Sequence, residues 1–388
     1  MADSPLVPQE VLAHWHHQIH TINDPFINGL PKVELHMHIE GALTAELRWK
    51  FSKRNGIPVI NHKDNTEFSS MQELKDSYLA TGDWGFFEAY YHGLQALHTS
   101  EDFYELAMDY FEKAAQMNIR YAEVFFDPQE HTFRGVPFNV FMDAFVKASK
   151  DAADHLKVQS SWIMCINRQK SLKSGLEHLE MALPYRDSIA GIGLDAPEHG
   201  KPVMLFEELW IRASDLGFKL TSHCDTGHED TILNVTSVVC EANRGRGLDR
   251  CDHGLSAARS PELVAQIVDK KIGMTLCPWG YIRWDCDEHI LGKIRLLYDA
   301  GAIVTINSDD PGYMGDCYLI HALRLCRYFG GFSEADLVKF QLNAVDISWA
   351  NEQDKLALTR EITSYAEEKL DAGVPAPTNG AAPIRSPM

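Results

Sequence analysis

The stretch Pro31-Lys-Val-Glu-Leu-His-Met-His-Ile-Glu-Gly41 decides the fold. It predicts a short buried strand over Val33–His38 that ends in two histidines separated by one residue. Alternate residues of a strand point to the same side, so His36 and His38 can bind one metal ion together. Strands contain such pairs by chance, so the meaning of this pair depends on what the other strands carry at their ends.

Short apolar runs rich in β-branched residues recur along the chain, separated by longer stretches with helical periodicity. This alternation implies parallel strands joined by right-handed crossovers. Eight such units predict an α/β protein built as a single (β/α)8 TIM barrel, although an open doubly wound sheet gives similar local signals. The predicted strands are Val33–His38, Arg120–Phe126, Ser160–Asn167, Ile189–Asp195, Lys219–His223, Arg250–His253, Ile272–Cys277 and Ala302–Ser308. The predicted helices between them include Glu101–Met117, Asn139–His155, Leu205–Leu216, Pro261–Lys270 and Ile290–Asp299.

The connection between the first two strands, residues 41–116, is far too long for one helix. It predicts extra helices that form a lid over the mouth of the barrel. We expect three parts in the chain: an N-terminal helical extension over residues 1–24, the barrel over 25–371, and a disordered tail over 372–388 that is rich in Pro, Gly and Ala.

The composition sets limits on the partners and location of the protein. The formal net charge is −19, so nucleic acid and anionic membranes, which are densely negative, would repel the chain. The sequence has no apolar run of about 18 residues that could span a bilayer, and it does not start with a basic-then-apolar signal segment. Its eight cysteines are scattered without Cys-x-x-Cys pairs. This pattern is typical of reduced, buried thiols in a cytoplasmic protein.

Four histidines, His14, His16, His17 and His20, cluster near the N-terminus. Such a cluster can bind a metal ion, but no carboxylate or cysteine completes a site in this part of the sequence. We therefore expect a solvated helix that precedes the barrel.

Ligand-type residues stand at the ends of several predicted strands. The fifth strand ends in His223, the sixth in Asp252-His253-Gly254 and the eighth in Asn307-Ser-Asp-Asp-Pro311. In a barrel, the carboxyl ends of all strands meet at one face, where active sites are built. Three imidazoles and a carboxylate suit zinc or a similar cation, which can lower the pKa of bound water and supply a nucleophile. His253 is placed to hydrogen-bond or deprotonate that water.

These motifs, in this order, resemble the adenosine and adenine deaminases of the amidohydrolase superfamily. The resemblance extends from about Pro31 to about Ala350. It rests on the opening stretch, the closing Asn307–Pro311 motif and two landmarks between them, Gly191-Ile-Gly-Leu-Asp195 and Arg250-Cys-Asp-His-Gly254. Glu123-Val-Phe-Phe-Asp-Pro-Gln129, followed by His131, Arg134 and Gly135, is closer to the adenine branch than to the adenosine branch.

The resemblance implies roles for individual residues. It implies one zinc ion per chain, with His253 orienting the attacking water and Asp310 exchanging a hydrogen bond with the imidazole nitrogen of a purine. It places the backbone of Gly193 against the pyrimidine edge, where a side chain would collide. The implied zinc ligands are His36, His38, His223 and Asp309, and the other implied substrate contacts are Asp195, Phe86 and Tyr90.

The chain departs from the family where the proton donor is expected. In the family, a glutamate that protonates the purine ring follows the zinc histidine of strand five by three residues. Thr226 occupies that position here, and threonine has no proton to give at a useful pKa. The nearest carboxyl groups belong to Asp225 and Glu229. We favour Asp225 as the general acid because it would share a face with His223 if strand five continued regularly, and a turn, which Gly227 permits, could bring either carboxyl inward.

A second departure follows strand seven. The family has a Cys-Pro-x-Ser-Asn-like turn, whereas this chain reads Cys277-Pro-Trp-Gly-Tyr-Ile-Arg-Trp284. This change is either a repacked surface loop or a remodelled pocket for a different substituent, with Arg283 meeting a polar or anionic group.

We therefore expect a zinc-dependent hydrolytic deaminase that removes the 6-amino group of adenine or a close aminopurine and releases ammonia. Its partners would be the small purine and water, and the sequence carries no prediction of oligomeric state. Alternatives within the same fold are N6-substituted adenines, which would release an alkylamine, and adenosine or a nucleotide. An alternative of another class is a catalytically silent metal-binding barrel. The His-x-Glu and Pro-Cys-x-x-Cys signature of cytidine deaminases is absent.

Overall fold

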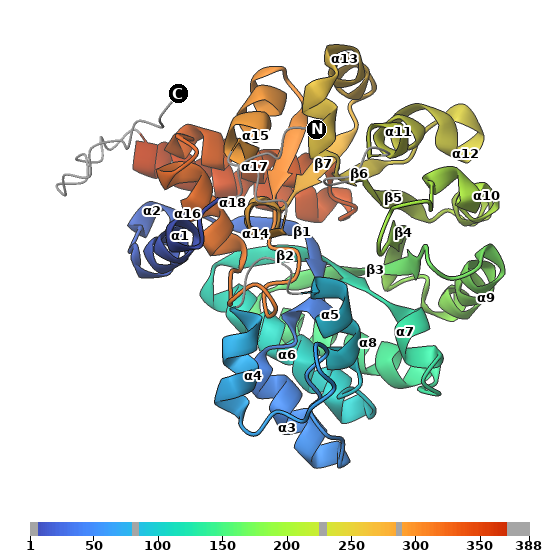
Figure 1. The fold of residues 1–388 in the computed structure, drawn as a ribbon. Coiled ribbons are helices and arrows are strands. Elements are labelled where there is room, and N and C mark those ends of the chain that lie inside the picture. Colours follow the sequence, from blue (N-terminus) through green and yellow to red (C-terminus); the bar gives the residue numbers. More distant parts are fainter. Residues whose placement is uncertain (1–6, 80–84, 225–230, 285–288, 371–388) are drawn as a thin grey trace.

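Eight parallel strands form one sheet in the order in which they occur along the chain (Figure 1). They are β1 (Lys32–His38), β2 (Ile119–Phe126), β3 (Gln159–Asn167), β4 (Ile189–Asp195), β5 (Lys219–Cys224), β6 (Arg250–His253), β7 (Gly273–Leu276) and β8 (Ile303–Ile306). The computed structural model describes residues 7–79, 85–224, 231–284 and 289–370. Each strand overlaps the run predicted for it, so the (β/α)8 barrel is confirmed.

The barrel closes between its last and first strands. Met37 forms a parallel bridge with Asp309, just beyond the end of β8. The His38 N–H donates to the Asp309 carbonyl at 3.0 Å, and the Asp309 N–H donates to the His36 carbonyl at 3.1 Å. The backbone that closes the barrel therefore belongs to residues whose side chains were predicted to bind metal.

Helices connect the strands and cover the outside of the barrel (Figure 1). The α-helices are α1 (Gln9–Thr21), α2 (Pro25–Gly29), α3 (Ala45–Asn55), α4 (Met71–Tyr78), α5 (Phe86–Leu94), α6 (Ser100–Gln116), α7 (Pro128–Thr132), α8 (Phe138–Leu156), α9 (Leu172–Ala182), α10 (Glu207–Asp215), α11 (Thr231–Thr236), α12 (Ala242–Gly245), α13 (Pro261–Lys270), α14 (Pro278–Trp284), α15 (Ile290–Asp299), α16 (Leu319–Tyr328), α17 (Glu334–Ile347) and α18 (Glu352–Leu370). Short 3₁₀ turns are η1 (Glu40–Ala42), η2 (Leu183–Tyr185), η3 (Val203–Phe206) and η5 (Leu255–Arg259), and η4 (Ser237–Glu241) is a π-helical turn.

Local signals explain why the helix boundaries were predictable. At α13, the Ser260 side chain accepts the Leu263 N–H, Pro261 occupies the first helical position, and Lys271 ends the helix in a left-handed conformation. At α6, Thr99 and Asp102 form a reciprocal capping box, and one apolar face of the helix is buried. α13 matches its predicted range residue for residue, and α6 differs from its range by one residue at each end.

Two glycines on β4 leave room inside the barrel beneath the strand ends. A Cβ at Gly191 would lie 2.2 Å from the ring of Trp349, and a Cβ at Gly193 would lie 2.7 Å from Cys165 Sγ. Phe125 and Cys165 belong to the small apolar cluster against which Trp349 packs. The interior is therefore a packed core that supports the site above it.

The long connection after β1 holds several helices, as predicted: α3, α4, α5 and α6. The N-terminal α1 is also a helix, but its histidines are not simply solvated. The His16 ring donates to the Gly315 carbonyl at 2.8 Å, and the His20 ring stacks on His321 with centroids 4.1 Å apart. The expectation of a solvated helix is thus wrong for this face of α1, because α1 packs against α16 and the segment that precedes it.

The domain boundaries at residues 24 and 371 stay predictions, and the tail over 372–388 lies outside the described residues. All seven cysteines in the described part are free thiols. Within the described ranges, no helix combines the length and apolar character needed to cross a membrane.

Candidate active site

Four side chains predicted as metal ligands meet at the carboxyl ends of the strands. His36 and His38 project from the same face of β1, His223 stands on β5, and Asp309 follows β8. The Nε2 atom of His223 lies 2.9 Å from His36 Nε2 and 3.3 Å from His38 Nε2. The Asp309 Oδ1 atom lies 3.3 Å from His36 Nε2 and 3.7 Å from His38 Nε2. The fold therefore brings together ligand-type residues from β1, from β5 and from the segment after β8, which are far apart in the sequence.

This donor set fits a zinc ion. Ligand atoms bound tetrahedrally at about 2.0–2.2 Å lie roughly 3.3–3.5 Å apart, close to the separations seen here. Burial lowers the pKa of His38 to about 3 and lowers the pKa of His223 well below its usual value, so both imidazoles are neutral. Burial opposes ionisation of Asp309, but the neighbouring histidines hold its pKa below the usual value. Neutral imidazoles and a carboxylate are the forms that bind a cation.

A buried chain of hydrogen bonds orients His36. The Thr275 hydroxyl donates to Asp252 Oδ1 at 2.8 Å, so its oxygen is left to accept the His36 Nδ1–H at 2.9 Å. Thr221 donates to the other oxygen of Asp252 at 2.5 Å. With its Nδ1 proton committed in this way, His36 presents the lone pair of Nε2 to the cluster. Such second partners fix the tautomer of a metal-binding histidine.

His253 lies beside the cluster at the end of β6. Its ring centroid is 4.6 Å from that of His36 and 4.9 Å from that of His223. His253 adopts a left-handed conformation with φ 62°, which is uncommon for a residue other than glycine. Its Nδ1 forms a 2.8 Å hydrogen bond with the Tyr281 hydroxyl, which also accepts the Cys277 N–H at 2.9 Å. Burial lowers the pKa of His253 to about 3, so the ring is neutral.

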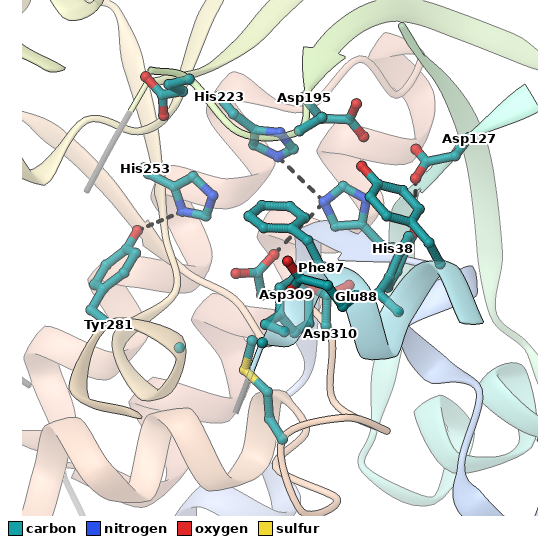
Figure 2. Close-up of a pocket in the computed structure, with 18 residues that line it drawn as sticks. His38, Phe87, Glu88, Asp127, Asp195, His223, His253, Tyr281, Asp309 and Asp310 are labelled. Atoms are coloured by element: carbon teal, nitrogen blue, oxygen red, sulfur yellow. Dashed lines mark hydrogen bonds and ion pairs between the residues drawn. The ribbon is translucent and has the colours of Figure 1, made fainter. Parts of the chain in front are cut away.

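The strand ends open into a cavity of about 550 Å³ (Figure 2). This volume is in the range of small-molecule sites. Figure 2 shows His38, His223, His253 and Asp309 on one side of the cavity and the helix that carries Phe87 and Glu88 on another. The described lining residues are His38, Gly85, Phe86, Phe87, Glu88, Tyr90, Tyr91, Asp127, Asp195, Ala196, Glu198, His223, His253, Gly280, Tyr281, Asp309, Asp310 and Met314.

Two buried carboxyl groups, Asp127 and Asp195, form a pair in this cavity. They hydrogen-bond to each other, and the Tyr90 hydroxyl donates to Asp127 Oδ2 at 2.8 Å. Burial, reinforced by Glu40, raises the pKa of Asp127 to about 8, and burial, reinforced by Asp127, raises that of Asp195 well above its usual value. Two adjacent carboxylates cannot both ionise easily, so the pair holds a proton at neutral pH.

A second layer of polar groups supports Asp127 from behind. Glu40 Oε1 accepts the Asp127 N–H at 3.1 Å and the His131 Nε2–H at 2.7 Å. His131 must carry that proton on Nε2, because its Nδ1 accepts from the Arg134 guanidinium at 2.9 Å. The His-x-x-Arg segment that resembles the adenine branch therefore positions the loop after β2.

Asp310 is held in place by the close approach of a glycine. A Cβ at Gly41 would lie 2.1 Å from Asp310 Oδ1, so only glycine fits there. Burial raises the pKa of Asp310 well above its usual value, and the neighbouring Asp309 adds to this effect. Asp310 is therefore a protonated carboxyl group that can donate a hydrogen bond into the cavity.

The helix α5 forms an aromatic wall, as expected for a lid element. Phe86 packs against Tyr90 with ring centroids 5.8 Å apart, and Tyr90 packs against Tyr313 at 5.7 Å. Phe87 is 37% exposed, so it stands at the rim of the cavity, where the wall meets solvent.

None of the described residues that line the cavity is lysine or arginine. Residues 80–84, 225–230 and 285–288, which lie outside the described ranges, contain no lysine or arginine in the sequence. Arg168 is buried behind the cavity, where it donates to the His223 carbonyl at 2.6 Å and to the Asp195 carbonyl at 3.0 Å. The cavity thus combines several carboxyl groups with no described cationic side chain.

Comparison with known proteins identifies the family. The family model described as "Adenosine deaminase" matches residues 31–365. The chain belongs to the adenosine deaminase family. An uncharacterized deaminase of Schizosaccharomyces pombe is 37% identical over 88% of this chain and 97% of its own length. An adenine deaminase of Vibrio parahaemolyticus is 35% identical over 88% of this chain and 98% of its own length.

Two solved structures agree with the fold described above. The crystal structure of an adenine deaminase from Arthrobacter aurescens has a TM-score of 0.79 and 29% identity, covering 87% of this chain and 99% of that chain. An amidohydrolase of Burkholderia ambifaria, solved with bound zinc, has a TM-score of 0.77 and 28% identity, covering 91% of this chain and 97% of that chain. The chain is therefore an enzyme of the hydrolytic deaminase class.

The structure places most, but not all, of the predicted site residues in the cavity. Asp195, Asp310, Phe86, Tyr90 and His253 line it with the metal-ligand group. Asp225 and Glu229 lie outside the described residues, so the identity of the general acid stays a prediction.

Two predicted substrate contacts are placed differently. Arg283 does not line the cavity, because it is buried on α14 and donates to the Tyr78 carbonyl. Gly193 also lies away from the lining, and the collision that excludes a side chain there is with Cys165 rather than with a ligand. The segment after strand seven is not a surface loop, since Trp279 and Tyr281 are buried and Gly280 and Tyr281 line the cavity.

Several residues were missed by the sequence reasoning. Asp252 and Thr275 orient His36, Asp127 pairs with Asp195, and Tyr281 holds His253. Asp252 and Asp127 stand inside motifs that resemble the family, so their position in those motifs was the available signal. Thr275 reads as an ordinary strand residue and carried no such signal.

Proposed function

We propose that this enzyme is a zinc-dependent hydrolytic deaminase that removes the 6-amino group of adenine or a close aminopurine. The observation that carries the proposal is the meeting of three imidazoles, one carboxylate and His253 at the floor of a cavity rich in protonated carboxyl groups. The named adenine deaminases at about 35% identity support the substrate class. A cytoplasmic location stays a prediction.

The residues that would hold zinc are His36, His38, His223 and Asp309. When bound, the ion supplies a Lewis acid that activates a water molecule as the nucleophile. His253 is the residue that takes a proton from the attacking water, since it is neutral, adjacent and held by Tyr281. The same proton can then be passed to the departing amine, which leaves as ammonia.

The purine would be recognised by carboxyl groups that burial holds in the protonated form. A protonated Asp310 donates to a ring nitrogen. In the Asp127–Asp195 pair, a carboxyl O–H can donate to a ring nitrogen and a carbonyl oxygen can accept from a ring N–H. We propose Asp225 as the group that protonates the ring during attack, with Glu229 as the alternative.

The lack of a cationic side chain among the described lining residues favours a base over a nucleotide. A phosphate group would enter a space lined by carboxyl groups, with no lysine or arginine among the described lining residues to meet it. Arg283, the cation that could have met it, is committed to the Tyr78 carbonyl. We therefore propose an uncharged substrate.

One observation favours a second candidate, an N6-substituted adenine. Gly280 lines the cavity beside the metal group, and a Cβ there would already approach Asp309 Oδ2 to 3.3 Å. The absence of a side chain at this point leaves space beside Asp309 for a substituent on the departing amine.

Amine release from a panel of purines tests these proposals. The zinc-loaded protein should act on adenine or on an N6-alkyladenine with much higher kcat/KM than on AMP. Alkylamine released from N6-methyladenine at a greater rate than ammonia from adenine would select the second candidate. Equal or greater turnover of AMP would overturn the proposed preference for an uncharged base, and no turnover of any member by metal-replete protein would overturn the enzymatic assignment.

A further inference from the structure

A second group of metal-type ligands lies away from the catalytic cavity. His16 and His20 stand one turn apart on α1, and Cys317 lies in the segment between β8 and α16. One ligand atom of each residue lies within 4.8 Å of the others. In the sequence the cysteine is about 300 residues from the histidines, so only the fold brings them together.

Both imidazoles are arranged as metal ligands usually are. The His16 ring donates Nε2–H to the Gly315 carbonyl at 2.8 Å, and the His20 ring donates Nδ1–H to the His16 carbonyl at 2.8 Å. A carbonyl can only accept, so each ring is left with its other nitrogen as a lone-pair donor. A metal-binding histidine commonly anchors its second nitrogen on a backbone carbonyl in this way.

The available nitrogen of His20 has no protein partner in the described part of the chain. Its Nε2 is buried and makes no hydrogen bond with the described residues. A buried polar atom without a partner carries a free-energy penalty of about 1–3 kcal/mol. A bound cation would remove this penalty.

The third ligand is a buried thiol. Cys317 is fully buried and is not part of a disulfide among the described residues. Thiolate and imidazole together select zinc, cobalt or copper rather than calcium or magnesium, which prefer oxygen ligands. Binding of such an ion would displace the thiol proton.

The group also has an open side. His16, His20 and Asp316 line a cavity of about 190 Å³, which can hold water. His321 stacks on His20 but cannot act as a metal ligand in its neutral form. Its Nδ1 lone pair already accepts the Tyr318 N–H at 3.1 Å, so the ring proton is on Nε2. A fourth ligand would therefore be a water molecule in this cavity.

We propose that His16, His20 and Cys317 form a second transition-metal site, with water as fourth ligand, that ties α1 to the segment after β8. This segment continues from Asp309, Asp310 and Met314, which line the catalytic cavity. The ring centroid of His16 also lies 5.7 Å from that of Trp279 on α14. Trp279 directly precedes Gly280 and Tyr281, which line the catalytic cavity. The second ion braces the wall of the catalytic cavity without taking part in the reaction.

Cobalt substitution of the full chain tests this proposal, because the two sites differ in sulfur. The group around His36 binds through nitrogen and oxygen, so a thiolate-to-cobalt charge-transfer band in the near ultraviolet reports the second site. We expect this band and about two cobalt ions per chain, one for each site. Cys317→Ser should remove the band and lower the content to about one ion, and His20→Gln should do the same. Cobalt should also raise the Tm of the wild type more than that of Cys317→Ser, by mass action.

Cys277→Ser is the matched control, because Cys277 is the cysteine near the catalytic histidines. The band should survive in this variant. A wild-type chain that binds about one ion and shows no thiolate band would overturn the proposal. A band that persists in Cys317→Ser, or one that disappears in Cys277→Ser, would overturn it as well. If Cys317→Ser does not fold, the number of cobalt ions bound by the wild type and the absorption spectrum of His20→Gln still test the proposal.

Discussion

Replacing Thr275 with valine isolates the hydrogen-bond chain behind His36. Thr275→Val keeps the shape of this buried side chain but removes the hydroxyl that accepts from His36 Nδ1 at 2.9 Å and donates to Asp252 at 2.8 Å. His36 then loses the partner that holds its Nε2 lone pair toward the metal position. Loss of such a second partner lowers metal affinity by about 10–100-fold, which corresponds to about 1.4–2.7 kcal/mol.

Zinc affinity measured by competition with a chromophoric chelator gives the magnitude directly. Thr305→Val is the matched control, since Thr305 is an equally buried threonine on β8 whose hydroxyl donates to the Met274 carbonyl at 3.2 Å and accepts from Asn307 Nδ2 at 3.0 Å rather than from a metal-type ligand. Thr275→Val should weaken zinc binding while Thr305→Val should not, and kcat per bound zinc should change little in either. Wild-type affinity in a folded Thr275→Val protein would refute the argument that this chain positions His36.

Three further outcomes follow from the site. His253→Ala should retain zinc and lose about two to four orders of magnitude in kcat, the range for a lost acid–base group, and unchanged turnover in the metal-replete variant would show that His253 is structural. Asp225→Asn should bind zinc and purine yet lose at least about a hundredfold in kcat, with a much smaller loss for Thr226→Val; the reverse order would remove Asp225 from the mechanism. The raised pKa of Asp127, about 8, means that Asp127 carries a proton below that pH and loses it above. The kcat/KM profile should therefore fall as the pH rises through about 8, and a profile left unchanged by Asp127→Asn would contradict the role of the pair.

The eight strands were predictable because short, largely buried apolar runs, several of them rich in β-branched residues, alternate with stretches of helical periodicity. The ligand group was predictable too, because a closed barrel brings every strand end to one face, so that His36, His223 and Asp309 must be neighbours once the strands are assigned. Here the sequence periodicity predicted the strands, and the strand order of a closed barrel then predicted which residues lie close together.

Contacts set by side-chain direction were not predictable. Arg283 reads as a free cation near the cavity, yet its helix turns it toward the Tyr78 carbonyl. Thr275 reads as an ordinary strand residue. The sequence left the segment after strand seven open between a surface loop and a remodelled pocket, and the structure shows helix α14, which contributes Gly280 and Tyr281 to the cavity. His16 and His20 read as solvated because their partner Cys317 is distant in sequence. Each error concerns which neighbour a side chain meets, and strand or helix periodicity does not encode that.

The backbone bonds between β1 and the residue after β8 have a consequence for the order of events during synthesis. His36 and His38 leave the ribosome early, whereas Asp309 emerges after most of the chain. The same Asp309 residue supplies both the peptide groups that seal the barrel and the only carboxylate of the ligand group. A nascent chain therefore has an incomplete ligand set until its circle of strands is sealed. Binding of the proposed ion by all four residues would therefore follow closure of the barrel.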